Sequence, residues 1–333
     1  MIKIGLIGAG FMGSMHASCY EALAERYDFR ITAVADDDPE KAANIAAKFG
    51  AAVYPSGAAL IAEGDVDTVD ICLPTYLHFE AASEAVKKGY NAFIEKPVCL
   101  NESEADRLLA LQRETGANVM VGQCIRFWPE YRELARLVRD NAYGPVRSGV
   151  FRRISPRPGW AWRDWLHEAD KSGSAALDLH VHDVDFVRSL FGEPDSLKAE
   201  IVRQDGLNAH IFSLYRYGDA VVTLEGGWDN PENFPFEMAY RVRFERATAV
   251  FSSASQPTLR IYENGGAVVE PAMDGFAGAA DGPEGGNISS LGGYYNELAY
   301  FLDCLTAGRP IRESTLQDGC DSLRLTLRAV ASA

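Results

Sequence analysis

The chain has 333 residues, a length that favours two domains, and its 47% hydrophobic and 24% charged residues are typical of a globular protein. Its formal net charge of −15 argues against a nucleic-acid partner, because proteins that bind nucleic acids concentrate Lys and Arg. No apolar run approaches the about 20 residues that span a bilayer, so the sequence predicts no membrane association.

The first 120 or so residues alternate short apolar strands with helical segments, which predicts a doubly wound parallel sheet. The chain opens directly on a strand without the charged and apolar regions of a signal peptide, so we expect no secretory signal. The strands are almost continuously apolar, as expected where helices cover both faces of a sheet. We predict strands at residues 2–7, 30–35, 69–73, 91–94 and 119–121, and helices at 11–26, 39–49, 79–88 and 102–115.

The pattern changes after Trp128, where an amphipathic helix at residues 130–141 leads into a strand-rich region. At residues 240–245 apolar and charged side chains alternate, which predicts a strand with one buried face. Loops interrupt the region at 155–159 and 275–286, and the second is either a surface loop or a lid. We predict strands at residues 146–154, 197–202, 210–217, 220–226, 238–245 and 249–252, with closing helices from 294 and 316.

The turn after the first strand carries Gly8, Gly10 and Gly13, the spacing of a dinucleotide-binding turn. Gly8 allows the tight turn, Gly10 lets the backbone approach a pyrophosphate, and Gly13 lets helix and strand pack closely. Phe11 and Met12 begin the helix whose N-terminus faces the phosphates. The alternative is a purely structural strand–helix turn.

The second strand ends at Asp36, followed by Asp37 and Asp38. An acid at this position binds the ribose hydroxyls of NAD, whereas NADP requires a cation for its 2′-phosphate. We therefore expect NAD, with NADP disfavoured. Alternatively, Asp37 and Asp38 only face water and start the next helix.

Residues at the ends of two further strands complete the predicted cofactor edge, because open parallel sheets bind ligands at their carboxyl ends. Leu73, Pro74 and Thr75 follow one strand, and His78 either lines the cofactor or braces this loop. Glu95 and Lys96 end the next strand before Pro97. The Lys96 ammonium would hydrogen-bond a substrate oxygen and stabilise alkoxide character; alternatively, Glu95 and Lys96 form a surface ion pair.

Asp178 and His182 are four residues apart and share a helical face, and Asp185 follows three residues later. A carboxylate beside an imidazole fixes its tautomer and suits it to accept a hydroxyl proton. His180 and His182 with the nearby acids also allow a metal site, or a structural helix start. We predict no metal.

These motifs closely resemble the Gfo/Idh/MocA oxidoreductase family over nearly the whole chain. The resemblance implies an NAD-binding Rossmann domain at residues 1–122 and a substrate-binding and oligomerisation domain at 123–333. The second domain is expected to be α+β, built on a large, mostly antiparallel open sheet, with the C-terminal helices able to pack back on the first. The resemblance rests on Gly8–Gly13 with His16, Asp36, Pro74-Thr75 with His78, Glu95-Lys96-Pro97, Gly122 with Arg126-Phe127 and Pro129, residues 172–178, His182 with Asp185, and Tyr295 with Glu297.

By resemblance, His182 is the general base, Asp178 its orienting partner and Lys96 the group that polarises the substrate oxygen. His180 stands where family members often carry a glycine, so it either shapes the substrate pocket or turns away. Trp stacks on sugar rings and Arg binds hydroxyl or carboxylate groups. The predicted substrate contacts are therefore Gln123, Arg126, Trp162, Arg163 and His180, although the first four could instead be hinge packing.

The sequence thus predicts an NAD-dependent dehydrogenase that oxidises a secondary hydroxyl of a sugar, sugar derivative or inositol-like polyol. The family implies a homodimer or homotetramer formed through the C-terminal sheet. One rival is a non-catalytic sugar or dinucleotide sensor, and another is a reductase of a non-sugar C=O or C=N substrate.

The six cysteines are scattered without Cys-x-x-Cys spacing, which favours free, mostly buried thiols and a cytoplasmic location.

Overall fold

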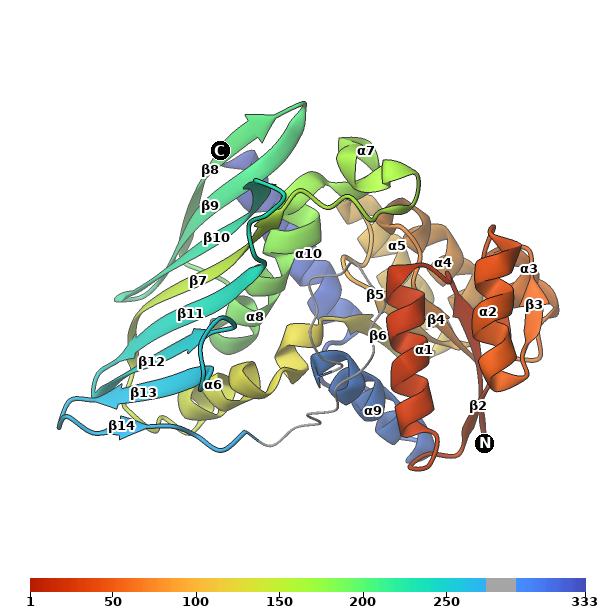
Figure 1. The fold of residues 1–333 in the computed structure, drawn as a ribbon, viewed down its shortest axis with the longest axis horizontal. Helices are drawn as coiled ribbons and strands as arrows, with labels where there is room; N and C mark the ends of the chain where they lie inside the picture. The colour runs from red at the N-terminus through yellow and green to blue at the C-terminus, as the bar shows by residue number, and fades with distance from the viewer. Residues whose placement is uncertain (274–291) are drawn as a thin grey trace. The chain divides into compact units, whose positions relative to one another are not determined.

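The computed structural model describes residues 1–273 and 292–333 of the chain, so the loop predicted at 275–286 lies outside the described residues. The chain divides into two compact units. Of the described residues, unit 1 contains 1–124 and 292–321, and unit 2 contains 125–273 and 322–333. Each unit is built around one sheet (Figure 1).

The sheet of unit 1 is parallel, with strand order β3-β2-β1-β4-β5-β6. In this order β1 and β4 are neighbours although β2 and β3 lie between them in sequence, which is the Rossmann arrangement. The carboxyl ends of β1, β4 and β5 therefore meet at one sheet edge. The strands are β1 (Ile2–Ile7), β2 (Phe29–Ala35), β3 (Ala52–Tyr54), β4 (Thr68–Ile71), β5 (Asn91–Glu95) and β6 (Val119–Gly122).

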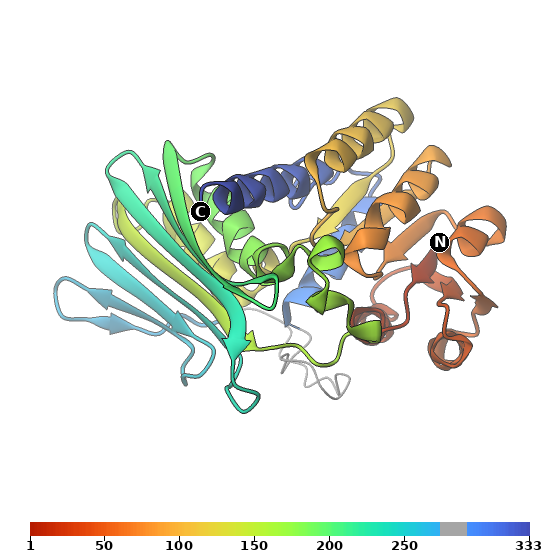
Figure 2. The same ribbon diagram turned by 90° about the horizontal axis from the view of Figure 1, so that it is seen from above.

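Helices lie on both faces of this sheet (Figure 2). The helix α1 packs beside α9, while α4 packs against α3 and α5. Local signals set the ends of several helices: Asn101 caps α5 through its side chain, and Gly50 and Gly116 end α2 and α5 in left-handed conformation. The helices of this unit are α1 (Phe11–Leu23), α2 (Pro39–Phe49), α3 (Gly57–Glu63), α4 (His78–Lys87), α5 (Glu102–Thr115) and α9 (Gly292–Thr306).

The C-terminal part of the chain returns to unit 1 after unit 2. Phe301 of α9 contacts Phe93 of β5 with ring centroids 5.6 Å apart, and the Ser314 hydroxyl donates to the Val121 carbonyl. The boundary between the units then falls inside α10 (Leu316–Ala331). The predicted second domain at 123–333 starts two residues before the observed boundary. It is also interrupted, because residues 292–321 belong to unit 1, where α9 packs beside α1.

The sheet of unit 2 has strand order β14-β13-β12-β11-β7-β10-β9-β8. Within this sheet, β7 and β10 pair in parallel and the other described pairs are antiparallel, so the predicted mostly antiparallel sheet is confirmed. The strands are β7 (Val146–Pro156), β8 (Ser196–Gln204), β9 (Leu207–Tyr217), β10 (Ala220–Asn230), β11 (Glu237–Phe244), β12 (Ala247–Ser252), β13 (Leu259–Glu263) and β14 (Val268–Val269).

The helices of unit 2 lie on one face of this sheet (Figures 1 and 2). They are α6 (Pro129–Arg139), α7 (Ala169–Ser172), α8 (Val181–Phe191) and the later part of α10. The Tyr131 ring of α6 packs edge-on against Phe186 of α8 and Tyr240 of β11. Tyr240, Val242 and Phe244 are buried while Arg241 is exposed, which is the alternation predicted from the sequence.

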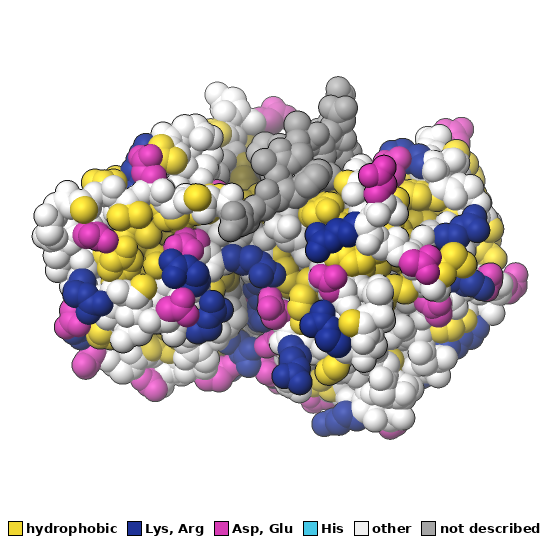
Figure 3. Space-filling model, turned by 90° about the horizontal axis from the view of Figure 1, so that it is seen from below, with side chains coloured by type: hydrophobic (Ala, Val, Ile, Leu, Met, Phe, Trp, Pro, Cys, Tyr) yellow, Lys and Arg dark blue, Asp and Glu magenta, His cyan; other side chains and the backbone are white. Residues whose placement is uncertain are grey.

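The surface carries side chains of several kinds. On the face shown in Figure 3, basic and acidic side chains are interspersed with hydrophobic ones. No helix among the described residues is long and apolar enough to cross a membrane. All six cysteines are free and buried.

A buried ion pair joins α8 to the sheet of unit 2. The Arg153 guanidinium of β7 donates to the Asp183 carboxylate at 3.0 Å, and the Tyr131 hydroxyl lies 3.4 Å from the same carboxylate. Both charged side chains are buried. Burial raises the pKa of Asp183, and Arg153 and Tyr131 act against this rise.

Replacing Asp183 with Ala leaves the Arg153 charge buried without its partner, which should lower the free energy of unfolding by about 3 to 5 kcal/mol. Replacing Glu133, which pairs with exposed Arg136, should change it by less than about 1 kcal/mol. Urea unfolding of the purified variants measures both. If Asp183→Ala and Glu133→Ala have equal effects, the Asp183–Arg153 pair does not hold α8.

Candidate functional site

The turn between β1 and α1 leaves room for a ligand at one glycine and none at the other two. Gly8 has φ of +98° and a Cβ there would lie 2.5 Å from the Cys72 carbonyl oxygen, whereas a Cβ on Gly13 would overlap the Gly8 carbonyl oxygen. A Cβ on Gly10 would meet no described atom within 4 Å. Phe11 and Met12 are half-buried at the first turn of α1. This pattern fits a turn whose backbone at Gly10 approaches a pyrophosphate.

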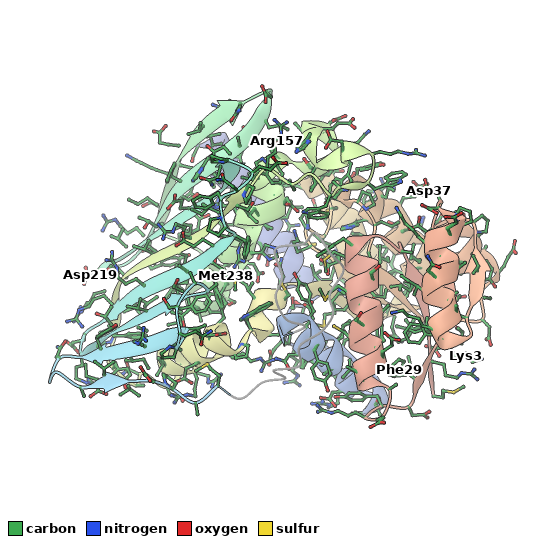
Figure 4. All side chains as sticks on the ribbon, in the orientation of Figure 1. Lys3, Phe29, Asp37, Arg157, Asp219 and Met238 are labelled. Atoms are coloured by element: carbon green, nitrogen blue, oxygen red, sulfur yellow. The ribbon has the colours of Figure 1, made fainter. Side chains whose placement is uncertain are left out.

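Asp36 lies beside this turn. Its carboxylate accepts hydrogen bonds from the backbone N–H of Ala9 at 2.6 Å and of Asp38 at 2.9 Å, so it ties the end of β2 to the glycine turn. Asp38 caps α2 by accepting from Glu40 and Lys41, which is the helix-start alternative for that residue. Asp37 is exposed between them (Figure 4). The remaining lone pairs of Asp36 fit ribose hydroxyls.

His78 braces the loop after β4 against the turn after β5. One ring nitrogen lies 2.7 Å from the Leu73 carbonyl oxygen and the other 2.8 Å from the Pro97 carbonyl oxygen. Burial lowers the pKa of His78, and the two carbonyl groups act against this change. Pro74 is half-buried and Thr75 is buried at the start of a short 3₁₀ turn. Of the two alternatives for His78, the contacts favour the brace.

Glu95 and Lys96 end β5 at the same sheet edge. Glu95 is buried, and one carboxylate oxygen lies 3.0 Å from Nε2 of His16 while the other accepts the Lys96 backbone N–H at 3.1 Å. Glu95 is therefore not half of a surface ion pair. Lys96 is partly exposed and joins Pro97 through a cis peptide bond.

Unit 2 places Asp178 and His182 on either side of a change in helix type. Residues Ala176–His180 form a single π-helical turn that leads directly into α8. Such turns widen the spacing of side chains and are frequent at functional sites. Asp178 is half-buried and His182 is buried. Lys96 belongs to unit 1, whereas Asp178 and His182 belong to unit 2.

The acids after His182 are held by arginines. Asp185 forms a two-bond ion pair with Arg126, at 2.6 and 2.7 Å, and accepts the Ser322 hydroxyl at 2.7 Å. Asp183 pairs with Arg153, as described above. Both carboxylates are fully buried, so they serve the core of unit 2, and the Asp185 pair holds Arg126 in place.

His180 turns toward the sheet. Its Nε2 lies 2.9 Å from the Ser213 hydroxyl of β9, and a Cβ on Gly226 of β10 would lie only 2.8 Å from the His180 Cβ. Burial and the nearby His210 lower the pKa of His180 to about 3. Of the two alternatives for His180, this placement is the one in which it turns away, and we do not retain it as a substrate contact.

Three other predicted substrate contacts, Trp162, Arg163 and Gln123, lie in segments away from His180 in the chain. Trp162 begins a 3₁₀ segment (Trp162–His167), and the Arg163 guanidinium lies 4.3 Å from its ring centroid. Gln123 follows β6 and is fully buried, and neither atom of its amide has a hydrogen-bond partner among the described residues. A buried amide without a partner is costly.

The main feature missed by the sequence reasoning is a buried cluster around His16. Its Nδ1 lies 2.8 Å from the Asp70 carboxylate, and its Nε2 faces Glu95. Asp70 lies inside an apolar strand, where an acid needs a partner, and this was the available signal. His16 and Glu297 were part of the family resemblance, but no role was assigned to them.

Two family models match the chain. Residues 2–123 match the model described as "Oxidoreductase family, NAD-binding Rossmann fold", and residues 131–250 match the GFO/IDH/MocA C-terminal domain. The chain belongs to the Gfo/Idh/MocA oxidoreductase family. It is accordingly an NAD-binding oxidoreductase, and the glycine turn and Asp36 described above fit that cofactor.

Curated members of the family align over much of the chain. The UDP-N-acetylglucosamine 3-dehydrogenase of Acidithiobacillus ferrooxidans is 28% identical over 317 residues, which cover 93% of this chain and 90% of that protein. The inositol 2-dehydrogenase of Rhizobium meliloti is 32% identical over 192 residues, 58% of this chain and 56% of that protein. A solved levoglucosan dehydrogenase with NADH and levoglucosan shares the fold, with a TM-score of 0.85, 22% identity and coverage of 100% of this chain and 97% of that one.

The two glycines of the turn should respond oppositely to alanine. Gly10→Ala adds a methyl group to open space, so the melting temperature should stay near wild type while NADH affinity falls about tenfold or more. Gly13→Ala overlaps the Gly8 carbonyl and should lower stability by about 1 to 3 kcal/mol. Thermal melts and NADH fluorescence titration measure the two effects. Wild-type NADH affinity in Gly10→Ala would show that the pyrophosphate does not lie at Gly10.

Proposed function

We propose that this family member is an NAD-dependent dehydrogenase that oxidises a secondary hydroxyl of a sugar, sugar derivative or polyol, and that also runs in reverse. The observation that carries the proposal is Lys96, held at the carboxyl end of β5 by the buried Glu95. An ammonium at this edge of a dinucleotide-binding sheet is suited to a substrate oxygen that gains negative charge. The relatives named for UDP-N-acetylglucosamine and inositol support a sugar or polyol substrate.

Three side chains carry the proposed chemistry. When bound, NAD accepts the hydride from the carbon that carries the hydroxyl. Lys96 donates a hydrogen bond to the hydroxyl oxygen and stabilises its developing charge. His182 accepts the hydroxyl proton as general base, and Asp178 orients its ring. Because oxidation releases the hydroxyl proton, it should be favoured at alkaline pH.

We also propose which residues contact the cofactor and the substrate. We propose that NAD is preferred over NADP because Asp36 and exposed Asp37 would repel a 2′-phosphate. Leu73, Pro74 and Thr75 line the cofactor in this proposal. The proposed substrate contacts are Gln123, whose amide has no partner, and Trp162 with Arg163. Arg126 is proposed to position its neighbours through Asp185.

We also propose a cytoplasmic location, because the six buried thiols are free.

The outer face of the sheet in unit 2 supports the proposed homodimer or homotetramer. Four apolar side chains on β8, β9 and β7 are exposed on this face: Val202 (48%), Phe212 (46%), Leu214 (41%) and Val150 (36%). A sheet face with several exposed apolar side chains is typical of a protein interface. The helices of unit 2 cover the opposite face, so a second copy of the chain is the proposed partner of this one.

Lys96→Met should abolish turnover, because no cation then stabilises the alkoxide, while the affinity for NADH stays near wild type. A panel of polyols and aldoses with NAD+ identifies the substrate, and the variant is then tested on it. Lys87→Met removes an exposed lysine of the same unit and should leave turnover unchanged. Turnover of Lys96→Met within tenfold of wild type would refute the assignment. Tight NADH binding by wild type without turnover of any compound would favour the sensor.

Phe212→Glu combined with Leu214→Glu should convert the assembly to single chains, because two carboxylates would be buried in the interface. Light scattering after size-exclusion chromatography gives the mass. Val53→Glu changes an equally exposed apolar residue of unit 1 and should leave the mass unaltered. A wild-type mass of one chain, or an unchanged mass in the double variant, contradicts the proposed interface.

A further inference from the structure

A cluster of five ionisable side chains is buried between the sheet of unit 1 and the helices α1 and α9. His16 comes from α1, Asp70 and Cys72 from the end of β4, Glu95 from the end of β5 and Glu297 from α9. Aromatic rings enclose it: Phe93 lies 5.4 Å and Tyr294 6.4 Å from the His16 ring centroid. Charges in such a site are costly unless they are paired or neutralised.

His16 is the positive charge of this cluster. Its Nδ1 is hydrogen-bonded to Asp70 at 2.8 Å, and its Nε2 lies 3.0 Å from a Glu95 oxygen without hydrogen-bond geometry. Two carboxylates so close favour the positive imidazolium. Burial lowers the pKa of His16, but Asp70 and Cys72 outweigh it and raise the pKa well above its usual value. The donor atoms around His16 are spaced closely enough for a metal ion; an imidazolium cannot ligate one, so we do not assign a metal site.

Burial and the neighbouring Glu95 charge favour the neutral form of Glu297. One oxygen of Glu297, one of Glu95 and one ring nitrogen of His16 all lie within 4.8 Å of one another. Both carboxyl oxygens of Glu297 are fully buried and have no hydrogen-bond partner among the described residues. Burial, followed by the Glu95 charge, raises the pKa of Glu297 well above its usual value. A second carboxylate beside Glu95 would be repelled, whereas a protonated acid there has a hydrogen to offer.

Glu95 connects this cluster to Lys96. One of its oxygens faces His16, and the other accepts the Lys96 backbone N–H. A Cβ on the neighbouring Gly122 would lie 3.0 Å from a Glu95 oxygen, so the carboxylate fills the space above β6. Any displacement of the Glu95 carboxylate therefore also displaces the backbone from which the Lys96 side chain extends.

We propose that Glu297 is a positioning residue: as a buried protonated acid it holds the Glu95 carboxylate in place, and Glu95 in turn holds the backbone of Lys96. The catalytic consequence rests on the proposed function of Lys96, whereas the placement of Glu95 and Lys96 does not. If Glu297 lost its proton, the Glu297 and Glu95 carboxylates would repel each other next to Lys96. The groups that share charge with Glu297 are His16 and Cys19 on α1, Asp70 on β4, Glu95 on β5 and Tyr294 on α9.

The backbone signal of Lys96 tests the proposal without substrate or cofactor. The chain has eight lysines, so selective ¹⁵N-lysine labelling gives few amide signals, and Lys96→Arg assigns the one of interest. Glu297→Gln keeps a neutral hydrogen-bond donor and should leave the Lys96 amide signal near wild type. Glu297→Leu keeps the size without a donor and should move the Lys96 signal more than that of any other lysine. Glu114→Gln, an exposed acid of the same unit, is the matched control.

Two results would overturn the proposal. If Glu297→Leu leaves the Lys96 signal in place, Glu297 does not position this backbone. If Glu297→Gln moves the signal as far as Glu297→Leu does, the group needed is a carboxylate and not a protonated acid.

The pH dependence of stability provides a second test, which remains valid if Glu297→Leu does not fold. Because the folded pKa of Glu297 is raised, the folded chain keeps a proton that the unfolded chain releases above about pH 4.5. The Glu297 contribution to stability is therefore full below that pH and is lost as pH rises toward the folded pKa. Over this window the unfolding constant of wild type should rise about tenfold per pH unit relative to Glu297→Gln. Parallel pH profiles of wild type and Glu297→Gln in urea unfolding would overturn the proposal.

Measurements of kcat then distinguish a positioning role of Glu297 from a general loss of stability in its variants. With the substrate from the panel, Glu297→Leu should lower kcat about a hundredfold with little change in the KM for NAD+, while Glu297→Gln should retain most of the wild-type kcat. Equal kcat losses in Glu297→Leu and Glu297→Gln would contradict the proposal. Absence of turnover in the wild type would count against the proposed function alone, since the amide and unfolding measurements need no turnover.

Discussion

Charged side chains buried beneath both sheets must each meet an opposite charge or lose their own, because the protein interior solvates ions poorly. In unit 1, His16 satisfies this requirement for Asp70 and Glu95, and Glu297 does so by keeping its proton. In unit 2, Arg153 and Arg126 satisfy it for Asp183 and Asp185. These pairs tie helices to strands, or α8 to the 3₁₀ segment that holds Arg126, at fixed points, whereas apolar contacts alone would leave more alternative packings available.

The need to pair buried charges also fixes the backbone beside two candidate catalytic residues. Lys96 directly follows the buried Glu95, and His182 directly precedes the buried Asp183. In both cases the buried carboxylate belongs to the adjacent residue, so the backbone of the proposed reactive group lies next to a fixed point. Precise placement of a reactive group is worth orders of magnitude in rate.

Sequence patterns predicted the regular elements well where local signals are strong. The helices Pro39–Phe49 and Glu102–Thr115 end at the predicted residues, because Asp38 and Asn101 cap their starts and glycines follow their ends. The elements β3, α3, β13 and β14 were missed: the three strands lie at or next to the edges of their sheets, and α3 is a short helix of seven residues. The assignment of α9 to unit 1 and the division of α10 between the two units also have no local signal, since they depend on contacts with residues far away in the chain.

The sequence by itself determined the glycine turn, the acid after β2, the Glu95-Lys96-Pro97 segment and the Asp178–His182 spacing, because each is a short-range pattern with its own backbone or chemical requirement. Only the tertiary structure decided that His180 faces Ser213, that Arg126 is held by Asp185 and that Glu297 lies beside Glu95. These outcomes depend on contacts between residues far apart in the chain, and on burial, which changes the charge a side chain can carry. Local sequence encodes neither.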